Sequence, residues 1–504
     1  MTNTDDDGLY RTSGPAAVTD ETDSHFDERT LTLERSSGPS AVIYLTPAER
    51  AARGRAVRAE LPRSAHANWQ PAPMRRDPVE LLEAQAHTRL PELCPIRYGR
   101  MLVSPFTFFR GGAYLMAADL ADGPRSGLHA QLCGDAHLCN FGVFAAPDRR
   151  LVFSISDFDE TLPGPFEWDV KRFAASFAVA GRENGFDEET RRSVVMAAVR
   201  EYRESMARFA EMRNIDVWYT RLDVEGILER FRGVMSRKQM KRVRSNVARV
   251  RTKDSLRALR KLCRSVDGEL RIVGDPPLVT PIEDVVPGAE RAHLEDVVRR
   301  MLRTYRRTLP RDRRHLLESY RYVHAARKVV GVGSVGARAW ILLMVGRDDN
   351  DPLFLQFKEA EASVLEPFLG KSQFAQHGHR VVEGQRMMQA TPDIMLGWER
   401  IVTIDGEKKD FYIRQLWDAK GSADVELMDQ AALAAYGRIC GWTLARAHAR
   451  AGDRIAIAAY LGNSDSFDRA LATFAETYAE QNDRDYRSLQ GAVTSGRVTA
   501  EMGI

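Results

Sequence analysis

Acidic and amide side chains stand close together in the second quarter of the chain. Asp135 follows a glycine, and Asn140 comes five residues later. The run Leu151–Ser156 has the composition of a short strand and leads into Asp157 and Asp159. A carboxylate can orient or deprotonate an attacking hydroxyl, and amide and carboxylate oxygens are ligands that Mg²⁺ prefers. The spacing therefore favours a phosphoryl-transfer loop, with Asp135 as the base and Asn140, Asp157 and Asp159 as metal ligands.

The alternative for this stretch is a set of solvated turns, since Gly-Asp and Asp-Phe-Asp-Glu are each common strings on their own. The combination of the spacing, the strand and the downstream Glu-Trp-Asp169 is much less common. We expect Asp169 to cap the next helix and to brace the loop. The catalytic-loop interpretation is therefore preferred over plain turns.

Small residues form a second pattern at Gly331, Gly333, Ser334 and Gly336. A lone Gly-x-Gly-x-x-Gly string is weak evidence for a kinase-type phosphate loop, because it also marks dinucleotide-binding folds and ordinary turns. A dinucleotide fold requires a helix directly after the glycines, whereas the run Ala339–Val345 has the composition of a strand. The glycines are therefore predicted to lie in a hairpin, where backbone N–H groups can cover phosphates.

Lys358 ends the next predicted strand and could pair with the α- and β-phosphates of a nucleotide. The alternative is an edge-strand lysine whose stem packs on apolar surface. A phosphate-binding lysine normally pairs with a helix glutamate, and Glu383 is the expected partner. A helix cannot run there directly from Lys358, because His377-Gly378 would interrupt it.

Several strings together resemble the kinase-like phosphotransferases of the aminoglycoside and choline kinase type. More closely, the chain is similar to an uncharacterised bacterial family, domain-of-unknown-function family 2252. The strings that carry the resemblance, over roughly residues 46–490, begin at Arg97, Ser104, Gly134, Asp157, Lys358, Arg380 and Lys420. The resemblance implies an α+β, two-lobed fold with a large helical lobe, a small antiparallel β lobe, and ATP and Mg²⁺ as cofactors. Gln415 and Trp417 resemble the strand and hinge that touch an adenine.

The order of the motifs differs from that of ordinary kinases, because the loop with Asp135 precedes the glycine-rich loop. A circular permutation explains this order and is tolerated when the original termini lie close together. The predicted helix 432–450 resembles the one that usually leads into the catalytic loop. We therefore expect His448 to pack beside Leu132–Asp135, and Asp157 and Lys358 to face one cleft.

The predicted organisation has five parts. They are a disordered tail (1–45), N-terminal helices with the catalytic and metal-binding loops (46–185), a helical insert (186–321), a β-rich nucleotide-binding lobe (322–425) and C-terminal helices (426–504). The formal net charge of +3 argues against a dedicated polyanion binder. No apolar run is long enough to span a membrane, and the N-terminus lacks a signal-peptide pattern, so we expect a cytoplasmic protein without membrane contact.

The leading functional hypothesis is an ATP- and Mg²⁺-dependent phosphotransferase with an unidentified small-molecule or protein acceptor. A nucleotidyl transferase or a nucleotide-binding pseudokinase would keep most of the same residues. A nucleic-acid-binding protein is the second alternative, because residues 237–264 contain twelve Lys or Arg and one acid. That segment lacks interleaved aromatics, so recognition of an acidic or phosphorylated substrate is the more economical use of it. The oligomeric state stays open.

Overall fold

The computed structural model describes residues 44–230, 237–252, 254–288, 291–403, 406–416 and 419–504. Its contacts divide the chain into two compact units, residues 1–46 and 47–504. The predicted tail lies almost wholly outside the described residues.

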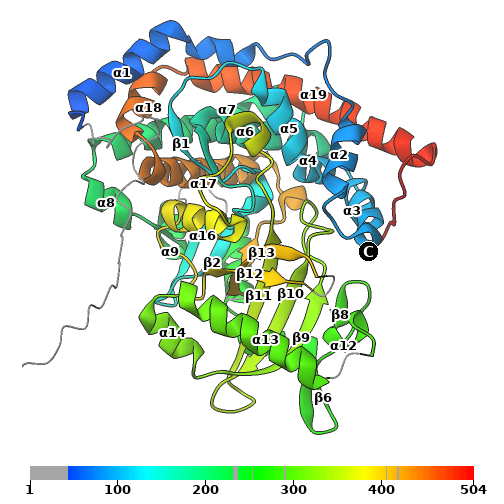
Figure 1. Cartoon of the computed structure of the whole chain (residues 1–504). Coiled ribbons are helices and arrows are strands. Elements are labelled where there is room, and N and C mark those ends of the chain that lie inside the picture. The colour runs from blue at the N-terminus through cyan, green and yellow to red at the C-terminus, as the bar shows by residue number, and fades with distance from the viewer. Residues whose placement is uncertain (1–43, 231–236, 253, 289–290, 404–405, 417–418) are drawn as a thin grey trace, which may run out of the picture. The chain divides into compact units, whose positions relative to one another are not determined.

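Helices from both ends of the chain pack together in the upper part of Figure 1. Close approach depends on glycine: a Cβ on Gly54 would lie 2.1 Å from the carbonyl oxygen of Ala456, and one on Gly441 would lie 2.4 Å from that of Ala198. The described helices are α1 (Pro47–Glu60), α2 (Pro78–Ala86), α3 (Cys94–Met101), α4 (Pro105–Gly111), α5 (Ala113–Ala121), α6 (Phe166–Glu183), α7 (Glu188–Glu211), α8 (Asn214–Tyr219), α9 (Val224–Arg230), α10 (Arg237–Arg251), α11 (Ser255–Leu262), α12 (Ile282–Val285), α13 (Arg291–Tyr305), α14 (Arg311–Leu317), α15 (Glu366–Leu369), α16 (His377–Met388), α17 (Gln430–Ala451), α18 (Arg454–Leu461) and α19 (Ser466–Thr494).

The strands form antiparallel sheets, as expected for an α+β protein. Their bounds are β1 (His129–Leu132), β2 (Phe141–Ala145), β3 (Leu151–Ile155), β4 (Leu162–Pro165), β5 (Leu222–Asp223), β6 (Cys263–Val266), β7 (Glu269–Ile272), β8 (Val279–Pro281), β9 (Arg321–Lys328), β10 (Ala339–Val345), β11 (Pro352–Ala360), β12 (Gly397–Val402), β13 (Lys408–Gln415) and β14 (Gly421–Ser422). The largest sheet has the order β12-β13-β11-β10-β9-β8.

Both faces of the six-stranded sheet are covered. Leu355 and Phe357 of β11 pack on one face with Tyr305 of α13. Phe354 points to the other face, where Ala258 of α11 covers it. Since side chains alternate along a strand, Lys358 lies on the same face as Phe354. The register pairs Lys358 with Ala339, the first residue of β10, so the lysine lies at the end of the sheet next to the glycine-rich loop.

A smaller hairpin, β2–β3, places two predicted site residues at one end. Asn140 directly precedes β2, and Phe141 pairs with Ile155 near the end of β3. The Ser156 N–H donates to the carbonyl of Asn140 at 2.8 Å, which closes the hairpin before Asp157. The hairpin therefore brings Asn140 and Asp157 together.

The predicted elements agree with the structure in several places. The strand predicted at 151–156 is β3, and the helix predicted at 432–450 is α17, which begins after Asp429, whose side chain caps it. The stretch predicted to be a helical insert also contains β5–β8. Strand β8 joins the large sheet, where it covers an edge of β9 that would otherwise be unpaired.

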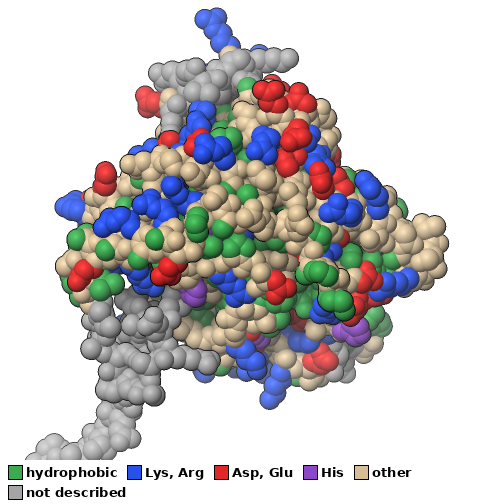
Figure 2. Space-filling view, turned by 90° about the horizontal axis from the view of Figure 1, so that it is seen from above, with side chains coloured by type: hydrophobic (Ala, Val, Ile, Leu, Met, Phe, Trp, Pro, Cys, Tyr) green, Lys and Arg blue, Asp and Glu red, His purple; other side chains and the backbone are tan. Residues whose placement is uncertain are grey.

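None of the helices in the described part of the chain combines the length and apolar composition needed to span a membrane. On the face drawn in Figure 2, Lys and Arg side chains are intermixed with Asp and Glu. Hydrophobic side chains are scattered among them. This face therefore has no field of one sign that would attract a polyanion.

Candidate functional site

A cavity of about 970 Å³ lies where the glycine-rich loop meets the loops at the ends of the β2–β3 hairpin. This volume is typical of small-molecule sites. The predicted site residues that line it are Asp135, Asn140, Asp157, Asp159, Gly331, Gly333 and Ser334. Two motifs that are far apart in the sequence therefore share one cavity.

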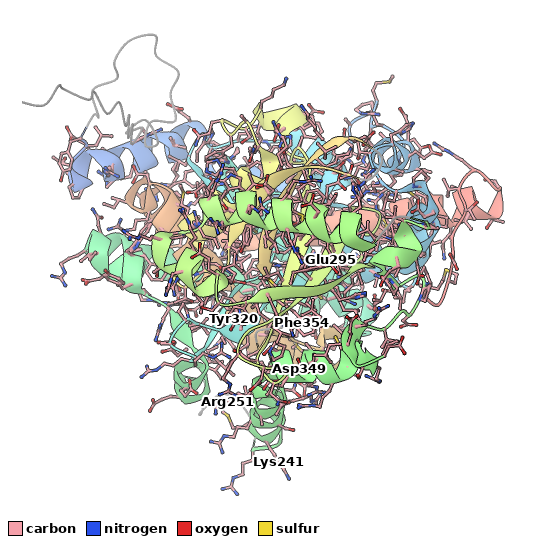
Figure 3. The ribbon with its side chains drawn as sticks, turned by 60° about the horizontal axis from the view of Figure 1, so that its bottom comes forward. Lys241, Arg251, Glu295, Tyr320, Asp349 and Phe354 are labelled. Carbon is pink, nitrogen blue, oxygen red and sulfur yellow. The ribbon has the colours of Figure 1, made fainter. Side chains whose placement is uncertain are left out.

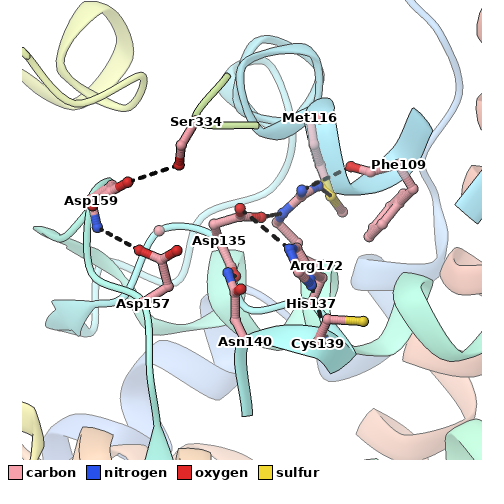
Figure 4. A network of polar contacts seen from close by, with 12 residues as sticks. Phe109, Met116, Asp135, His137, Cys139, Asn140, Asp157, Asp159, Arg172 and Ser334 are labelled. Carbon is pink, nitrogen blue, oxygen red and sulfur yellow. Dashed lines mark hydrogen bonds and ion pairs between the residues drawn. The ribbon is translucent and has the colours of Figure 1, made fainter. Parts of the chain in front are cut away.

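Asp135 is clamped by Arg172 of α6 (Figure 4). Arg172 is itself fixed, because it donates to the carbonyl of Phe109 at 2.9 Å and lies over the Phe109 ring. Burial raises the pKa of Asp135 to about 6; Arg172 opposes this rise, and the neighbouring Asp157 adds to it. A carboxylate with this pKa is ionised at neutral pH and can still accept a proton, as a general base must.

Two neighbours fix the shape of the loop. The Asn140 side-chain amide donates to the carbonyl of Asp135 at 2.8 Å, which leaves Asn140 Oδ1 as the atom that can bind a cation. The Cys139 N–H donates to His137 Nδ1 at 3.2 Å, so His137 carries its proton on Nε2, 3.6 Å from Asp135 Oδ2. Burial holds the pKa of His137 well below its usual value, so this ring is neutral.

Asp159 is held by three side chains. Lys358 forms an ion pair with Oδ2, the Tyr412 hydroxyl donates to Oδ1 at 2.7 Å, and the Ser334 hydroxyl donates to Oδ2 at 3.2 Å. Burial would raise the pKa of Asp159, but the Lys358 charge and the Tyr412 hydrogen bond hold it below its usual range. The glycine-rich loop, the sheet and the loop after β3 therefore meet at one carboxylate.

Lys358 is buried, with 3% of its surface exposed. It does not line the cavity itself, whereas its partner Asp159 does. Burial would lower the pKa of Lys358, but the charges of Asp157 and Asp159 raise it above its usual value. Lys358 is therefore a permanent cation next to both carboxylates. Lys358 therefore lies near Asp157, as expected, but only the aspartate lines the cavity.

The expected pair between Lys358 and Glu383 does not form. Glu383 of α16 lies 2.9 Å from Arg386 and 3.9 Å from His379 on the same helix. The face of α16 that meets the loop after β3 carries Arg380, which donates to the carbonyls of Asp159 and Thr161 at 2.8 and 2.7 Å. The helical register thus turns Glu383 away, and Asp159 supplies the negative charge for Lys358.

The glycine-rich loop is held from outside by its backbone. The Leu90 N–H donates to the carbonyl of Gly336 at 2.8 Å, and Arg100 donates to that of Gly331 at 2.5 Å. Both glycines have positive φ, 70° for Gly331 and 94° for Gly336. A Cβ on Gly336 would lie 2.8 Å from that of Arg89. Gly336 does not line the cavity and serves to let the loop pack against the segment before α3.

Of the two residues expected at an adenine, only Gln415 is described, and it is not brought to this cavity. Gln415 does not line it, and its backbone N–H donates to Asp393 at 2.6 Å. Trp417 lies outside the described residues.

The C-terminal helix α17 ends beside the loop of Asp135. His448 Nε2 lies 3.2 Å from Asp169 Oδ2, and Asp169 accepts the N–H groups of Cys133 and Gly134 at 2.8 and 3.0 Å. A Cβ on Gly452 would lie 2.8 Å from the carbonyl oxygen of β1 residue His129. The expected junction between α17 and this loop is therefore present. Asp169 braces the loop as predicted, but from the first turn of α6 and not as its N-cap.

The basic segment 237–264 forms α10 and α11. Its apolar side is buried: Val250 packs with Leu151 and Ala419, and Leu262 packs under the large sheet. Lys241 and Arg251 lie on α10 at the bottom of Figure 3, where Lys241 points away from the rest of the chain. This pattern is that of a helix with one solvated face, and nucleic-acid binding stays an untested prediction.

No group of three or more His, Cys, Asp or Glu side chains among the described residues is arranged to hold a metal ion. The oxygen donors of Asn140 and Asp157 nonetheless fit Mg²⁺, which commonly takes one or two protein ligands together with substrate phosphates and water. Asp159, the third predicted ligand, is occupied by Lys358. The site therefore suits a nucleotide-bound Mg²⁺ and not a cation bound by protein alone.

Sequence reasoning missed Arg172, Tyr412 and Arg380. Arg172 follows Asp169 by three residues, so a helix through 169 places both on one face, and this spacing could have been used. Tyr412 is found only through its pairing with Lys358 across β11 and β13. The register between β11 and β13 depends on how α15, α16 and β12, which lie between them in the sequence, pack. Composition does not define that packing.

Comparison with known protein families supports the resemblance to the uncharacterised bacterial family. A family model described as an uncharacterized protein conserved in bacteria matches residues 89–492. No curated protein and no solved structure matches the chain. Because the family match spans most of the 504 residues, the chain belongs to domain-of-unknown-function family 2252.

Proposed function

We propose that this protein is an ATP- and Mg²⁺-dependent phosphotransferase with a kinase-like, circularly permuted fold. The observation that carries the proposal is the convergence on one cavity of a glycine-rich loop, the Asp135–Asn140 loop, and Asp159, whose buried partner is Lys358. Phosphoryl transfer is mostly positioning and charge stabilisation, and these are the groups it requires.

The order of elements around Lys358 supports the proposal. The glycines connect β9 to β10, and Lys358 lies on the next strand, β11, which is followed by the short helix α15 and then by α16. In protein kinases the glycine-rich loop is followed by a lysine on the third strand and then by a helix. The contact between the end of α17 and the loop of Asp135 supports the permutation.

The roles of the residues follow from their surroundings. Asp135, with a pKa of about 6, would accept the proton of the attacking hydroxyl, and Arg172 would orient it. Asn140 and Asp157 would hold Mg²⁺, which supplies charge neutralisation at the phosphates. Ser334 and the backbone of the glycine-rich loop would cover the phosphates, while Lys358, paired with the lining residue Asp159, would supply a fixed positive charge.

Product analysis tests the proposal. The protein is incubated with ATP, Mg²⁺ and fractionated bacterial metabolites or proteins, and the nucleotide products are identified by mass spectrometry. ADP formation that is absent from Asp135→Asn supports phosphoryl transfer. Release of pyrophosphate would indicate a nucleotidyl transferase, and ATP binding without turnover a pseudokinase; either result would replace the proposal.

A further inference from the structure

Three arginines line the cavity beside the candidate base. Arg89 precedes α3, Arg97 lies within α3, and Arg110 lies near the end of α4. Arg97 and Arg110 belong to two strings that carry the family resemblance but have no part in phosphoryl transfer as described above. Their chemistry is therefore unassigned.

Arg97 is the most informative of the three. It lines the cavity, yet only 1% of its surface is exposed, and its Nε and Nη1 atoms have no hydrogen-bond partner within the described residues. Its Nη2 donates to Gln85 at 2.8 Å and to the carbonyl of Gly111 at 3.4 Å. A buried guanidinium with unused donors is costly unless an anion binds to it.

Protein carboxylates do not provide that anion. Across the part of the chain that is described, Arg97 forms no ion pair, and burial followed by the charge of Arg89 lowers its pKa to about 9. Glu160, whose charge acts on Arg97, accepts the N–H of Val364 at 2.8 Å, and within the described residues it leaves Arg97 Nε and Nη1 without a partner. The Nε atoms of Arg89 and Arg110 are also buried without a partner there.

The arginines are placed on the acceptor side of the site. The charge of Arg110 acts on Asp135 and on His137, which places it next to the base. Arg97 is joined to the same segment through Gly111. A group bound by Arg97 and Arg110 would therefore lie beside the carboxylate that accepts the acceptor's proton.

We propose that Arg97 and Arg110, with Arg89, bind an oxyanion of the acceptor, so that the acceptor of this phosphotransferase is a compound bearing a phosphate or carboxylate group. Guanidinium groups match the geometry of both anions. That the anion belongs to an acceptor depends on the proposed function, whereas the anion site itself does not.

Calorimetric titration of inorganic phosphate tests the site, with malonate as the carboxylate probe. Both titrations are made on the full-length protein alone and after saturation with Mg²⁺ and a non-hydrolysable ATP analogue, which fills the γ-phosphate position. We expect binding of at least one probe in both states, weakened at least about tenfold in Arg97→Gln and in Arg110→Gln. Affinity for the ATP analogue should change by less than about twofold in both variants.

Lys371→Gln is the matched control, because Lys371 lines the same cavity but is exposed to solvent. It should leave probe binding unchanged. If Arg97→Gln fails to fold, as judged by circular dichroism, the half-buried Arg110 carries the test.

The outcomes separate the two proposals. If the ATP analogue excludes both probes and itself binds more weakly to the variants, the arginines hold nucleotide phosphates and the inference is wrong. It is also wrong if neither probe binds, or if the variants bind them like the wild type. If a probe binds through the arginines but no nucleotide binds, the anion site stands and the phosphotransferase proposal fails.

Discussion

Buried Lys358 and half-buried Asp159 form an ion pair although 199 residues separate them in the sequence. The pair joins the large antiparallel sheet to the loop after β3. Tyr412 and Ser334 complete the shell around the same carboxylate. Any nucleotide phosphate that approaches Lys358 must therefore share it with Asp159.

Removing one partner of this pair should destabilise the fold. Lys358→Met leaves the half-buried Asp159 carboxylate without its main counter-charge, and Asp159→Asn leaves the buried ammonium group without one. Each change should lower the free energy of unfolding by about 3–5 kcal/mol. Urea unfolding followed by circular dichroism measures the free energy of unfolding of each variant.

The double variant Lys358→Met/Asp159→Asn serves as the control. It removes both charges, so its loss should be smaller than the sum of the single losses by about 1–3 kcal/mol. Additive losses would mean that the two charges do not stabilise one another.

Glu383→Gln should have almost no effect. Glu383 pairs with Arg386 at the surface of α16, about a third of both side chains is exposed, and such pairs contribute little. We expect a change of less than about 0.5 kcal/mol in stability and unchanged affinity for ATP. A loss of ATP binding comparable to that of Lys358→Met would show that α16 moves to bring Glu383 to the lysine.

The proposed phosphotransferase activity should depend on the ionisation of Asp135. Its pKa is raised to about 6, and the base is active only when ionised, so turnover should rise with pH through about 6 and fall below it. Arg172 lowers that pKa. Arg172→Gln should therefore move the rise to higher pH, whereas Arg172→Lys, which keeps a cation, should move it less.

Initial rates between pH 5 and 9 would measure this shift. Asp135→Asn should lower turnover by roughly 10²–10⁴-fold and leave nucleotide binding intact. A pH profile that is the same in the wild type and in Arg172→Gln would exclude Asp135 as the titrating base.

The sequence allowed the location of the candidate site residues to be predicted better than their pairing. Asp135, Asn140 and Asp157 could be placed from local spacing, because a tight loop and a hairpin hold them. The partner of Lys358 could not, since Asp159 meets it through tertiary packing. Whether Arg380 or Glu383 meets the loop after β3 depends on the rotation of α16 about its axis. That rotation is fixed by contacts with Thr161 and not by the helix's own composition.

Asp157→Ala should weaken nucleotide binding only when Mg²⁺ is present. Asp157 is the carboxylate of the proposed metal site, so its loss should lower the affinity for Mg²⁺–ATP by at least about tenfold. The affinity measured in EDTA should be nearly unchanged. Calorimetry under both conditions gives the comparison, and equal Mg²⁺–ATP affinity in variant and wild type would remove Asp157 from the metal site.

Helix α16 must lie close to the loop after β3, and Gly384 makes that approach possible. A Cβ at this position would lie 2.4 Å from Thr161 Cγ2, so Gly384→Ala should force α16 away from the loop and cost about 1–3 kcal/mol. It should also weaken ATP binding, because Arg380 on the same helix face holds the carbonyl of Asp159. In Gly491→Ala, the control in α19, the added methyl group meets open space and should stabilise the protein by about 0.5–1 kcal/mol. Thermal unfolding of the two variants side by side measures the contrast, and equal behaviour would mean that α16 is not packed against Thr161 in solution.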